Sequence, residues 1–277
     1  MKCIVTGAAG FIGSHLVRFL LSKQCEVTGF DNFSTGNQEN LDEITGTWTL
    51  VTGDLRNPAD VNQLFSGGET VFHLGAIPSV QRSVENPKDT FDANVNGTFY
   101  LLEAAKQAGA KRIIFASSSS VYGNIPGYPK KETAPVNPLS PYAASKLSGE
   151  ALMQSWASSQ GIETVCTRFF NVFGPRQDPS SQYSAVIPRF ITAILEGKSP
   201  TIFGDGKQSR DFTFIENLLS GLWLASQADA NKVSGEVFNL SCGDSHSVLD
   251  LVDELNQLLG SNIEPVHEAE RQGEVLH

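Results

Sequence analysis

Short apolar runs alternate with longer amphipathic stretches through the first 170 residues of this chain. The runs are rich in β-branched and aromatic residues and lie at 2–6, 26–30, 49–52, 70–74, 112–116 and 163–167. The helical stretches between them lie near 12–22, 58–66, 88–108 and 142–160. Parallel strands need a crossover connection, which is usually a helix. The alternation therefore predicts an α/β fold of the doubly wound type, a parallel sheet with helices on both faces.

The pattern changes after Gly174-Pro175, where proline, glycine, glutamine and serine become dense as far as Tyr183. Further helices are expected near 186–196, 215–227 and 247–259, with a strand near 236–240. We predict a dinucleotide-binding domain at 1–170, joined by a returning segment at about 210–240. Residues 171–209 and 241–277 would form a smaller mixed α/β substrate lobe, with a ligand cleft between the two parts.

Charge and hydropathy exclude several classes of function. The net charge is −10 and the longest basic clusters are the pairs Lys111-Arg112 and Lys130-Lys131, so binding to nucleic acid is not expected. No apolar stretch reaches 18 residues, and the N-terminal run is a strand rather than a signal peptide, so we expect a cytoplasmic protein. The four cysteines lack CxxC spacing, and no metal site is predicted.

Gly7, Gly10 and Gly13 form a glycine-rich loop between the first strand and the first helix. Glycines let backbone amides approach a pyrophosphate, and the helix N-terminus adds positive potential there. Asp31 ends the second strand, where a carboxylate accepts a hydrogen bond from a ribose 2′-hydroxyl and repels a 2′-phosphate. The pattern therefore predicts NAD rather than NADP. The simpler alternatives are a tight glycine turn and an aspartate that only caps a turn.

Lys146 follows Tyr142 by four residues, which places the two side chains on one face of a predicted helix. A phenol is a poor base at neutral pH because its unperturbed pKa is about 10. A neighbouring cation stabilises the phenolate and should lower the pKa of Tyr142. Of the five tyrosines, only Tyr142 has a lysine at this spacing, which can also arise by chance. The pair predicts a tyrosine that transfers protons.

Taken in order, the motifs of this chain resemble those of the extended short-chain dehydrogenase/reductase family, and most of all its nucleotide-sugar epimerases of the UDP-glucose (UDP-galactose) 4-epimerase type. The matching segments are 6–13, 31–32, 53–56, 94–98, 117–123, 142–146, 168–174, 210–212 and 271–274. The resemblance implies a Rossmann-type NAD-binding sheet and a UDP-sugar substrate.

The resemblance also implies roles for individual residues. Ser118, Tyr142 and Lys146 would be catalytic, and Lys146 would also hold the nicotinamide ribose. Arg210 and Arg271 would bind the UDP diphosphate, although Arg210 could instead pair with a nearby aspartate. The residues expected to contact the cofactor are Gly7, Gly10, Phe11, Ile12, Gly13, Asp31, Asn32, Gly36, Asp54, Leu55, Leu74, Gly75, Ala76, Asn94, Tyr142, Lys146 and Phe170. Those expected to contact the substrate are Ser79, Ser118, Asn171, Arg210, Arg271 and Glu274.

The function implied is NAD-dependent 4-epimerisation of UDP-glucose, UDP-galactose or their N-acetyl forms through a transient 4-keto sugar. The alternatives are a 4,6-dehydratase, a decarboxylase, a keto-sugar reductase or a non-catalytic NAD-binding protein. Related dehydratases carry adjacent carboxylates where this chain has Ser119 and Ser120, so elimination would lack its proton donor and acceptor.

The resemblance further implies a homodimer through the helices near 88–108 and 142–160, although the apolar residues there fit core packing equally well. The chain stops at His277, shortly after Glu274, whereas family members usually continue. We therefore expect a substrate lobe that is incomplete at its C-terminus. The sequence does not separate the plain UDP-hexoses from their N-acetyl forms.

Overall fold

A computed structural model describes residues 1–177 and 186–269 of the chain. Its main sheet has seven parallel strands in the order β11-β6-β5-β4-β1-β2-β3. They span Lys2–Thr6 (β1), Glu26–Asp31 (β2), Thr49–Thr52 (β3), Thr70–His73 (β4), Arg112–Ser118 (β5), Glu163–Phe169 (β6) and Glu236–Leu240 (β11). The strand order reverses beside β1, which is where doubly wound sheets bind ligands. The predicted α/β fold is confirmed.

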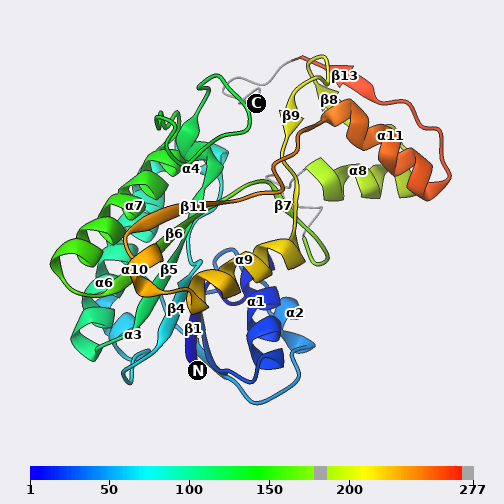
Figure 1. The fold of residues 1–277 in the computed structure, drawn as a ribbon. Coiled ribbons are helices and arrows are strands. Elements are labelled where there is room, and N and C mark those ends of the chain that lie inside the picture. Colours follow the sequence, from blue (N-terminus) through cyan, green and yellow to red (C-terminus); the bar gives the residue numbers. More distant parts are fainter. Residues whose placement is uncertain (178–185, 270–277) are drawn as a thin grey trace.

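Helices cover both faces of this sheet (Figure 1). One layer contains α1 (Phe11–Ser22) and α9 (Ile215–Gln227), and the other contains α3 (Pro58–Asn62), α6 (Gly97–Ala108) and α7 (Pro141–Ser159). The two layers use alternate residues of each strand, because successive strand side chains point to opposite faces. The first core contains Val5, Phe72, Ile114, Leu16 and Leu218, and the second contains Ile4, Val71, Ile113, Leu101 and Met153.

The helix predicted near 88–108 is confirmed, since helix runs without a break over 87–108 and only a π-helical segment interrupts its α-helical geometry. After α4 (Val80–Glu85), Asn86 caps α5 (Pro87–Phe91) by accepting a hydrogen bond from the Asp89 amide at 3.2 Å. A π-helical turn, η1 (Asp92–Asn96), then leads into α6. Proline suits the first turn of a helix, where its missing N–H has no partner to lose, so the Asn86-Pro87 pair begins a new helix here.

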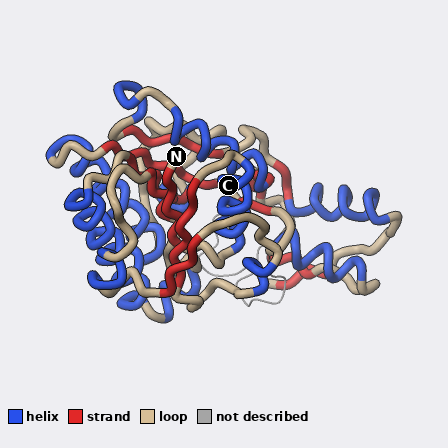
Figure 2. Tube along the Cα trace, turned by 90° about the horizontal axis from the view of Figure 1, so that it is seen from below, coloured by secondary structure: helices blue, strands red, loops and turns tan. Residues whose placement is uncertain are grey.

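The second part of the chain forms a lobe with a core of its own (Figure 2). Helix α8 (Val186–Leu195) packs against α11 (Val248–Leu259) through Phe190, Ile194, Val252 and Leu255. Short strand pairs complete this part of the chain: β7 (Val172–Phe173) with β10 (Thr213–Phe214), β9 (Ser209–Arg210) with β12 (His246–Ser247), and β8 (Thr201–Phe203) with β13 (Val266–Glu268).

Two parts of the intervening chain return to the main sheet. Helix α9 packs on α1, and β11 pairs with β6 at the sheet edge. The short elements α2 (Glu39–Asp42), η2 (Ser119–Tyr122) and α10 (Ala230–Val233) complete the chain. Within the residues described, none of the helices combines the length and apolar character needed to cross a membrane. The domain limits remain a prediction, although α9 and β11 occupy the predicted returning segment.

Candidate active site

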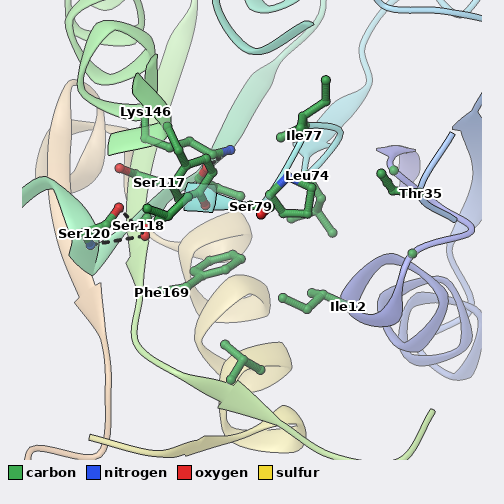
Figure 3. Close-up of a pocket in the computed structure, with 18 of the residues that line it drawn as sticks. Ile12, Thr35, Leu74, Ile77, Ser79, Ser117, Ser118, Ser120, Lys146 and Phe169 are labelled. Carbon is green, nitrogen blue, oxygen red and sulfur yellow. Dashed lines mark hydrogen bonds between the residues drawn. The ribbon is translucent and has the colours of Figure 1, made fainter. Parts of the chain in front are cut away.

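A cavity of about 1430 Å³ opens where the carboxyl ends of the strands face the second lobe. Drug-sized ligands usually occupy pockets of roughly 300–1,000 Å³, so this cavity has room for two bound molecules. Its wall runs from the glycine loop at Gly7, past Leu74 and Ser118, to Arg210. Figure 3 shows Ser118 and Lys146 on one side of the cavity and Ile12 on the other.

The glycine loop is packed too closely to accept side chains. Gly7 has a φ of +73°, in the left-handed region that favours glycine. A Cβ atom on Gly13 would lie 2.0 Å from the Gly7 carbonyl oxygen, and one on Gly7 would lie 2.9 Å from the Gly75 amide nitrogen. No side chain caps the N-terminus of α1, whose N-cap residue is Gly10. The amides of residues 7–10 already have acceptors inside the protein, so the first turn of α1 supplies the backbone donors that a pyrophosphate requires.

Asp31 lies at the end of β2 and lines the cavity while being 8% exposed. Its two oxygens accept hydrogen bonds from the amides of Ala9 and Phe33, each at 2.8 Å. The carboxylate thus holds the glycine loop, so the simpler alternative of a turn-capping aspartate describes part of its role. A carboxylate offers about four lone-pair positions, which leaves capacity for a ribose hydroxyl. The loop and Asp31 together fit an NAD dinucleotide.

Asp54 and Leu55 continue the cofactor side of the cavity wall. Leu55 packs so closely that a Cβ on Gly75 would lie 2.8 Å from its Cδ1. Hydrogen bonds from Arg56 hold the pKa of Asp54 well below its usual range, at about 2. Asn32 also donates to Asp54, at 3.0 Å. Asp54 is therefore ionised across the physiological range, and its negative charge is already paired.

The three predicted catalytic residues meet at the ends of β5 and α7. Ser118 ends β5, and its hydroxyl accepts hydrogen bonds from the Ser120 amide and hydroxyl, at 3.2 and 2.9 Å (Figure 3). Tyr142 and Lys146 occupy the first two turns of α7, and Lys146 Nζ lies 5.9 Å from the centre of the Tyr142 ring. Lys146 Nζ donates to the Ala116 carbonyl at 2.8 Å. All three residues line the cavity.

The expected lowering of the pKa of Tyr142 is not found in the structure. Burial raises the pKa of Tyr142, and the hydrogen bond with Ser118 only partly opposes this effect. Burial also lowers the pKa of Lys146 to about 8. Both shifts disfavour charge, because desolvation penalises the ionised form of each group. The spacing of the two residues predicts the attraction between their charges, but their desolvation depends on burial in the folded chain.

We predict a pH-dependent stability difference from Lys146. Its pKa in the folded chain is about 8, below that of an unfolded lysine, so between about pH 8 and 10 the unfolded chain binds more protons. Wild-type stability should therefore rise with pH relative to Lys146→Met, by at most about 1.4 kcal/mol per pH unit. Urea unfolding of both NAD-free proteins at pH 8 and 9.5 measures this. An equal change in both proteins would contradict the prediction.

His73 is a core residue, as its apolar strand predicts. It is 1% exposed, and burial lowers its pKa to about 3. Its ring nitrogens lie 2.8 Å from the Thr6 hydroxyl and 2.9 Å from the Thr98 hydroxyl. Both ring nitrogens therefore have partners, and the neutral imidazole links β1, β4 and α6 below the cavity.

Asn94 and Gly36 belong to the second layer of residues behind the wall, since neither is among the described residues that line the cavity. The Asn94 side chain accepts from the Ile77 amide at 2.8 Å and donates to the Ile77 carbonyl at 3.2 Å. It also donates to Ser145 on α7 at 3.0 Å. Gly36 packs against Ala9, where a Cβ would lie 2.8 Å from the alanine Cβ. Asn94 therefore positions Ile77, which does line the cavity.

The predicted substrate residues lie toward the second lobe. Asn171 donates to the Asp211 carbonyl at 3.1 Å, and Arg210 on β9 donates to the Ser209 carbonyl at 2.8 Å. Ser79 caps α4 by accepting from the Arg82 amide at 3.1 Å. These three predicted residues, Ser79, Asn171 and Arg210, all line the cavity. The other two predicted contacts, Arg271 and Glu274, lie outside the described residues.

The remaining predicted residues also reach the wall, although their roles stay predictions. They are Gly7, Gly10, Phe11, Ile12, Gly13, Asn32, Leu74, Gly75, Ala76 and Phe170. Tyr128, Lys130 and Gln177 also line the cavity, and sequence reasoning did not assign them to the site. Within the described residues, Gln177 Oε1 is buried without a hydrogen-bond partner, so it could accept from a ligand. These three residues lie in irregular segments, where no periodicity marks them.

Comparisons with known proteins agree with this architecture. Residues 3–241 match the model of the NAD dependent epimerase/dehydratase family. The UDP-glucose 4-epimerase of Mycolicibacterium smegmatis is 38% identical over 99% of this chain and 88% of its own length. The UDP-N-acetyl-alpha-D-glucosaminuronate decarboxylase of Bacillus cytotoxicus is 34% identical over 96% of this chain and 83% of its own. A similar solved structure is that of UDP-N-acetylglucosamine 4-epimerase from Methanobrevibacter ruminantium M1 in complex with UDP-N-acetylmuramic acid. It superposes on this chain with a TM-score of 0.94 and is 40% identical in sequence, and the match covers 100% of this chain and 87% of that one.

Proposed function

Since the chain belongs to the NAD-dependent epimerase/dehydratase family, we propose that it catalyses the 4-epimerisation of a UDP-hexose. The family resemblance predicted from the motifs is confirmed, and the cofactor is NAD. One observation carries the proposal: Ser118, Tyr142 and Lys146 converge on the same cavity wall, opposite Arg210 of the second lobe. That cavity has space for a dinucleotide and a sugar nucleotide together.

The three converging residues divide the proton chemistry between them. Tyr142 takes the proton from the sugar 4-hydroxyl, and the Ser118 hydroxyl bridges the sugar oxygen and the phenol. Lys146 keeps a positive charge one helical turn from the phenolate and so stabilises it. Bound NAD supplies the acceptor and donor of hydride for C4. The protein then returns the proton from Tyr142 to the inverted C4 oxygen.

Residues of the second lobe orient the substrate. Arg210 offers a planar guanidinium that suits a diphosphate, and Asn171 adds an amide beside it. Asp211, which is 5% exposed, accepts hydrogen bonds from the amides of Cys242 and Gly243 at 3.0 and 2.8 Å. These bonds fix the backbone next to Arg210. A nucleotide anchored here leaves the 4-keto hexose free to turn over between the two hydride transfers.

Neutral side chains argue against a dehydratase of the same family. The positions where elimination needs an acid and a base hold Ser119 and Ser120, and Ser120 is already bonded to Ser118. Epimerisation needs only the three converging residues and a retained cofactor.

The test is to incubate the purified protein with UDP-galactose, and separately with UDP-N-acetylgalactosamine, without added NAD. We expect NMR to show inversion at C4, because the cofactor is regenerated in each cycle and stays bound. The preferred sugar would define the substituent accepted at C2. Absence of inversion, with NAD released on denaturing the protein, would reject 4-epimerisation of these sugars.

The homodimer expected from the sequence also stays a proposal. On the segment near 88–108, Phe91 is 51% exposed and Phe99 is 40% exposed. Core packing therefore does not account for these two rings, and a second copy of the chain would cover them. Sedimentation of the purified protein measures this directly, and a monomer at micromolar concentration would reject it.

A further inference from the structure

A buried ion pair lies directly behind the three residues proposed as catalytic. Glu150 on α7 and Arg168 on β6 are 2% and 4% exposed. Arg168 Nε donates to Glu150 Oε1 at 2.8 Å, and Arg168 Nη2 donates to Glu150 Oε2 at 2.7 Å. This bidentate geometry fixes both side chains in one orientation. Neither residue lines the cavity within the described part of the chain, so neither is needed to contact a ligand.

The same pair is hydrogen-bonded to the strand that carries Ser118. The Ser117 hydroxyl donates to Glu150 Oε1, and Ser117 is 3% exposed. In the sheet, Ser117 pairs with Arg168 and Ser118 pairs with Phe169. Successive strand residues face opposite sides, so Ser117 and Arg168 meet α7 while Ser118 turns to the other face. Figure 3 shows Ser117 and Ser118 beside Lys146.

Glu150 also belongs to the helix that carries Tyr142 and Lys146. It follows Lys146 by four residues, so the two side chains leave α7 on one face, one turn apart. Helix α7 is thus fastened to β5 at two successive levels, by Lys146 Nζ on the Ala116 carbonyl and by Glu150 on Ser117. Two attachments fix both the position of the helix along the strand and its rotation.

The network extends to the loop that lines the cavity. The Arg168 guanidinium carbon lies 4.6 Å from the centre of the Tyr122 ring, and the Tyr122 hydroxyl donates to Asn239 Oδ1 at 2.7 Å. Asn239 Nδ2 donates to the Lys130 carbonyl at 2.8 Å. The buried Arg168 guanidinium thus interacts with Tyr122 as well as with Glu150. Buried ion pairs are weak evidence for stability, so stability alone does not account for this network.

We propose that the Glu150–Arg168 pair positions Tyr142 relative to Ser118 and thereby sets the turnover rate. The proposal rests on the proposed function and extends it to two residues that touch neither substrate nor cofactor. Proton transfer needs its partners within hydrogen-bond reach, and a displacement of about 1 Å can lower a rate by about 100-fold. The ion pair holds α7 in a fixed position against β5 and β6 and so prevents such a displacement of Tyr142.

The chain contains a matched control at the other end of the same two strands. Arg112 begins β5 and Glu163 begins β6, and the two residues pair in register. Arg112 Nε donates to Glu163 Oε2 at 2.7 Å, and Arg112 Nη1 donates to the Ala225 carbonyl at 2.7 Å. This pair joins β5 to β6 at the amino-terminal ends of the two strands, and neither residue lines the cavity within the described part of the chain. Its carboxylate side chain is 28% exposed, against 3% for Glu150, so the two pairs are compared at equal folded fraction.

The experiment compares two neutralised pairs, Glu150→Gln/Arg168→Gln and Arg112→Gln/Glu163→Gln. Changing both partners avoids leaving one buried charge alone. At equal NAD content and folded fraction, the first variant should lose kcat by about 10- to 100-fold with little change in KM, whereas the control should keep kcat within about 2-fold. A third variant, Ser117→Ala, keeps the ion pair and breaks its link to β5, and it should lower kcat in the same direction.

Equal kcat values for the two neutralised pairs, after correction for folded protein, would overturn the proposal. If the first variant does not fold, the comparison rests on Ser117→Ala, and wild-type kcat in that variant would overturn it. Hydrogen exchange at the amides of 142–146 gives a readout without turnover: exchange should be faster in the first variant than in the control. If the wild type inverts no UDP-sugar but the two variants still show this difference in exchange, the proposed function is rejected and the positioning role is retained.

Discussion

Replacing Tyr142 with phenylalanine should lower kcat by about 100- to 10,000-fold while NAD remains bound. The substitution removes the phenolic oxygen and leaves the ring, which lies at the start of α7 facing Ser118. Without that oxygen, no other described side chain at this wall combines the reach and the chemistry to take the proton. Steady-state turnover of a UDP-sugar, with NAD quantified in the denatured supernatant, measures both parts of the prediction.

Tyr100→Phe provides the matched control, because it removes the same atom from α6, where Tyr100 packs 5.9 Å from Phe99 outside the cavity lining. This variant should keep wild-type turnover. A Tyr142→Phe enzyme that kept more than about a tenth of wild-type kcat would assign the proton transfer to another group. Loss of NAD together with activity would instead indicate that the phenol mainly supports the cofactor site.

The strands of this fold were predictable because each is a short run rich in apolar residues. The inner strands β1, β4, β5 and β6 are almost entirely buried, whereas the edge strands β3 and β11 are only partly buried. The predicted limits of β1 and β3 match the structure, and β5 and β6 extend only two residues further, to Ser118 and Phe169. Those added residues lie at or next to the site. A hydropathy pattern does not detect them, because they are polar or lie beyond the apolar core. The small strands of the second lobe were missed because two or three residues contain no period to detect.

Helical periodicity predicted one helix at 88–108, and the structure has continuous helix over 87–108. It did not reveal η1, a π-helical segment inside that helix that no side-chain pattern marks. The turn carries Asn94, whose amide bonds to Ile77 and Ser145 place it behind the cavity wall. Contacts between residues so far apart in the chain depend on the folded arrangement, and only the structure reveals them.

The site was predicted best where a role demands a particular residue type and spacing. The glycine loop, Asp31 and the Tyr142–Lys146 pair fall into this group, since steric space, charge and helical period each restrict the choice of residue. The energetics were harder to predict. Whether a lysine lowers the pKa of its tyrosine depends on desolvation, which lowers the pKa of Lys146 itself to about 8. The Glu150–Arg168 pair was also unpredictable. Arg168 begins the matching segment 168–174, but nothing in the sequence places it beside Glu150.

Gly13→Ala should destabilise the chain by about 3 kcal/mol or more and abolish NAD binding. The added Cβ would lie 2.0 Å from the Gly7 carbonyl oxygen and 2.8 Å from the Gly7 carbonyl carbon. These are backbone atoms of the glycine loop, so they cannot move aside as the end of a flexible side chain could. Gly13 lies inside α1 with ordinary helical geometry, and alanine is the better helix former there. The expected loss therefore measures the shortage of space alone.

Gly10→Ala separates this steric effect from a general sensitivity of the loop. Its Cβ would lie 3.2 Å from the same Gly7 oxygen, so the neighbour needs to yield by only a few tenths of an ångström. Gly10 has a φ of −74°, which alanine adopts without strain. Thermal unfolding should rank wild type above Gly10→Ala and Gly10→Ala well above Gly13→Ala. Equal stability of the two variants would show that the glycine loop can relax around an added Cβ. Steric contact between α1 and Gly7 would then not explain why the loop needs glycine at position 13.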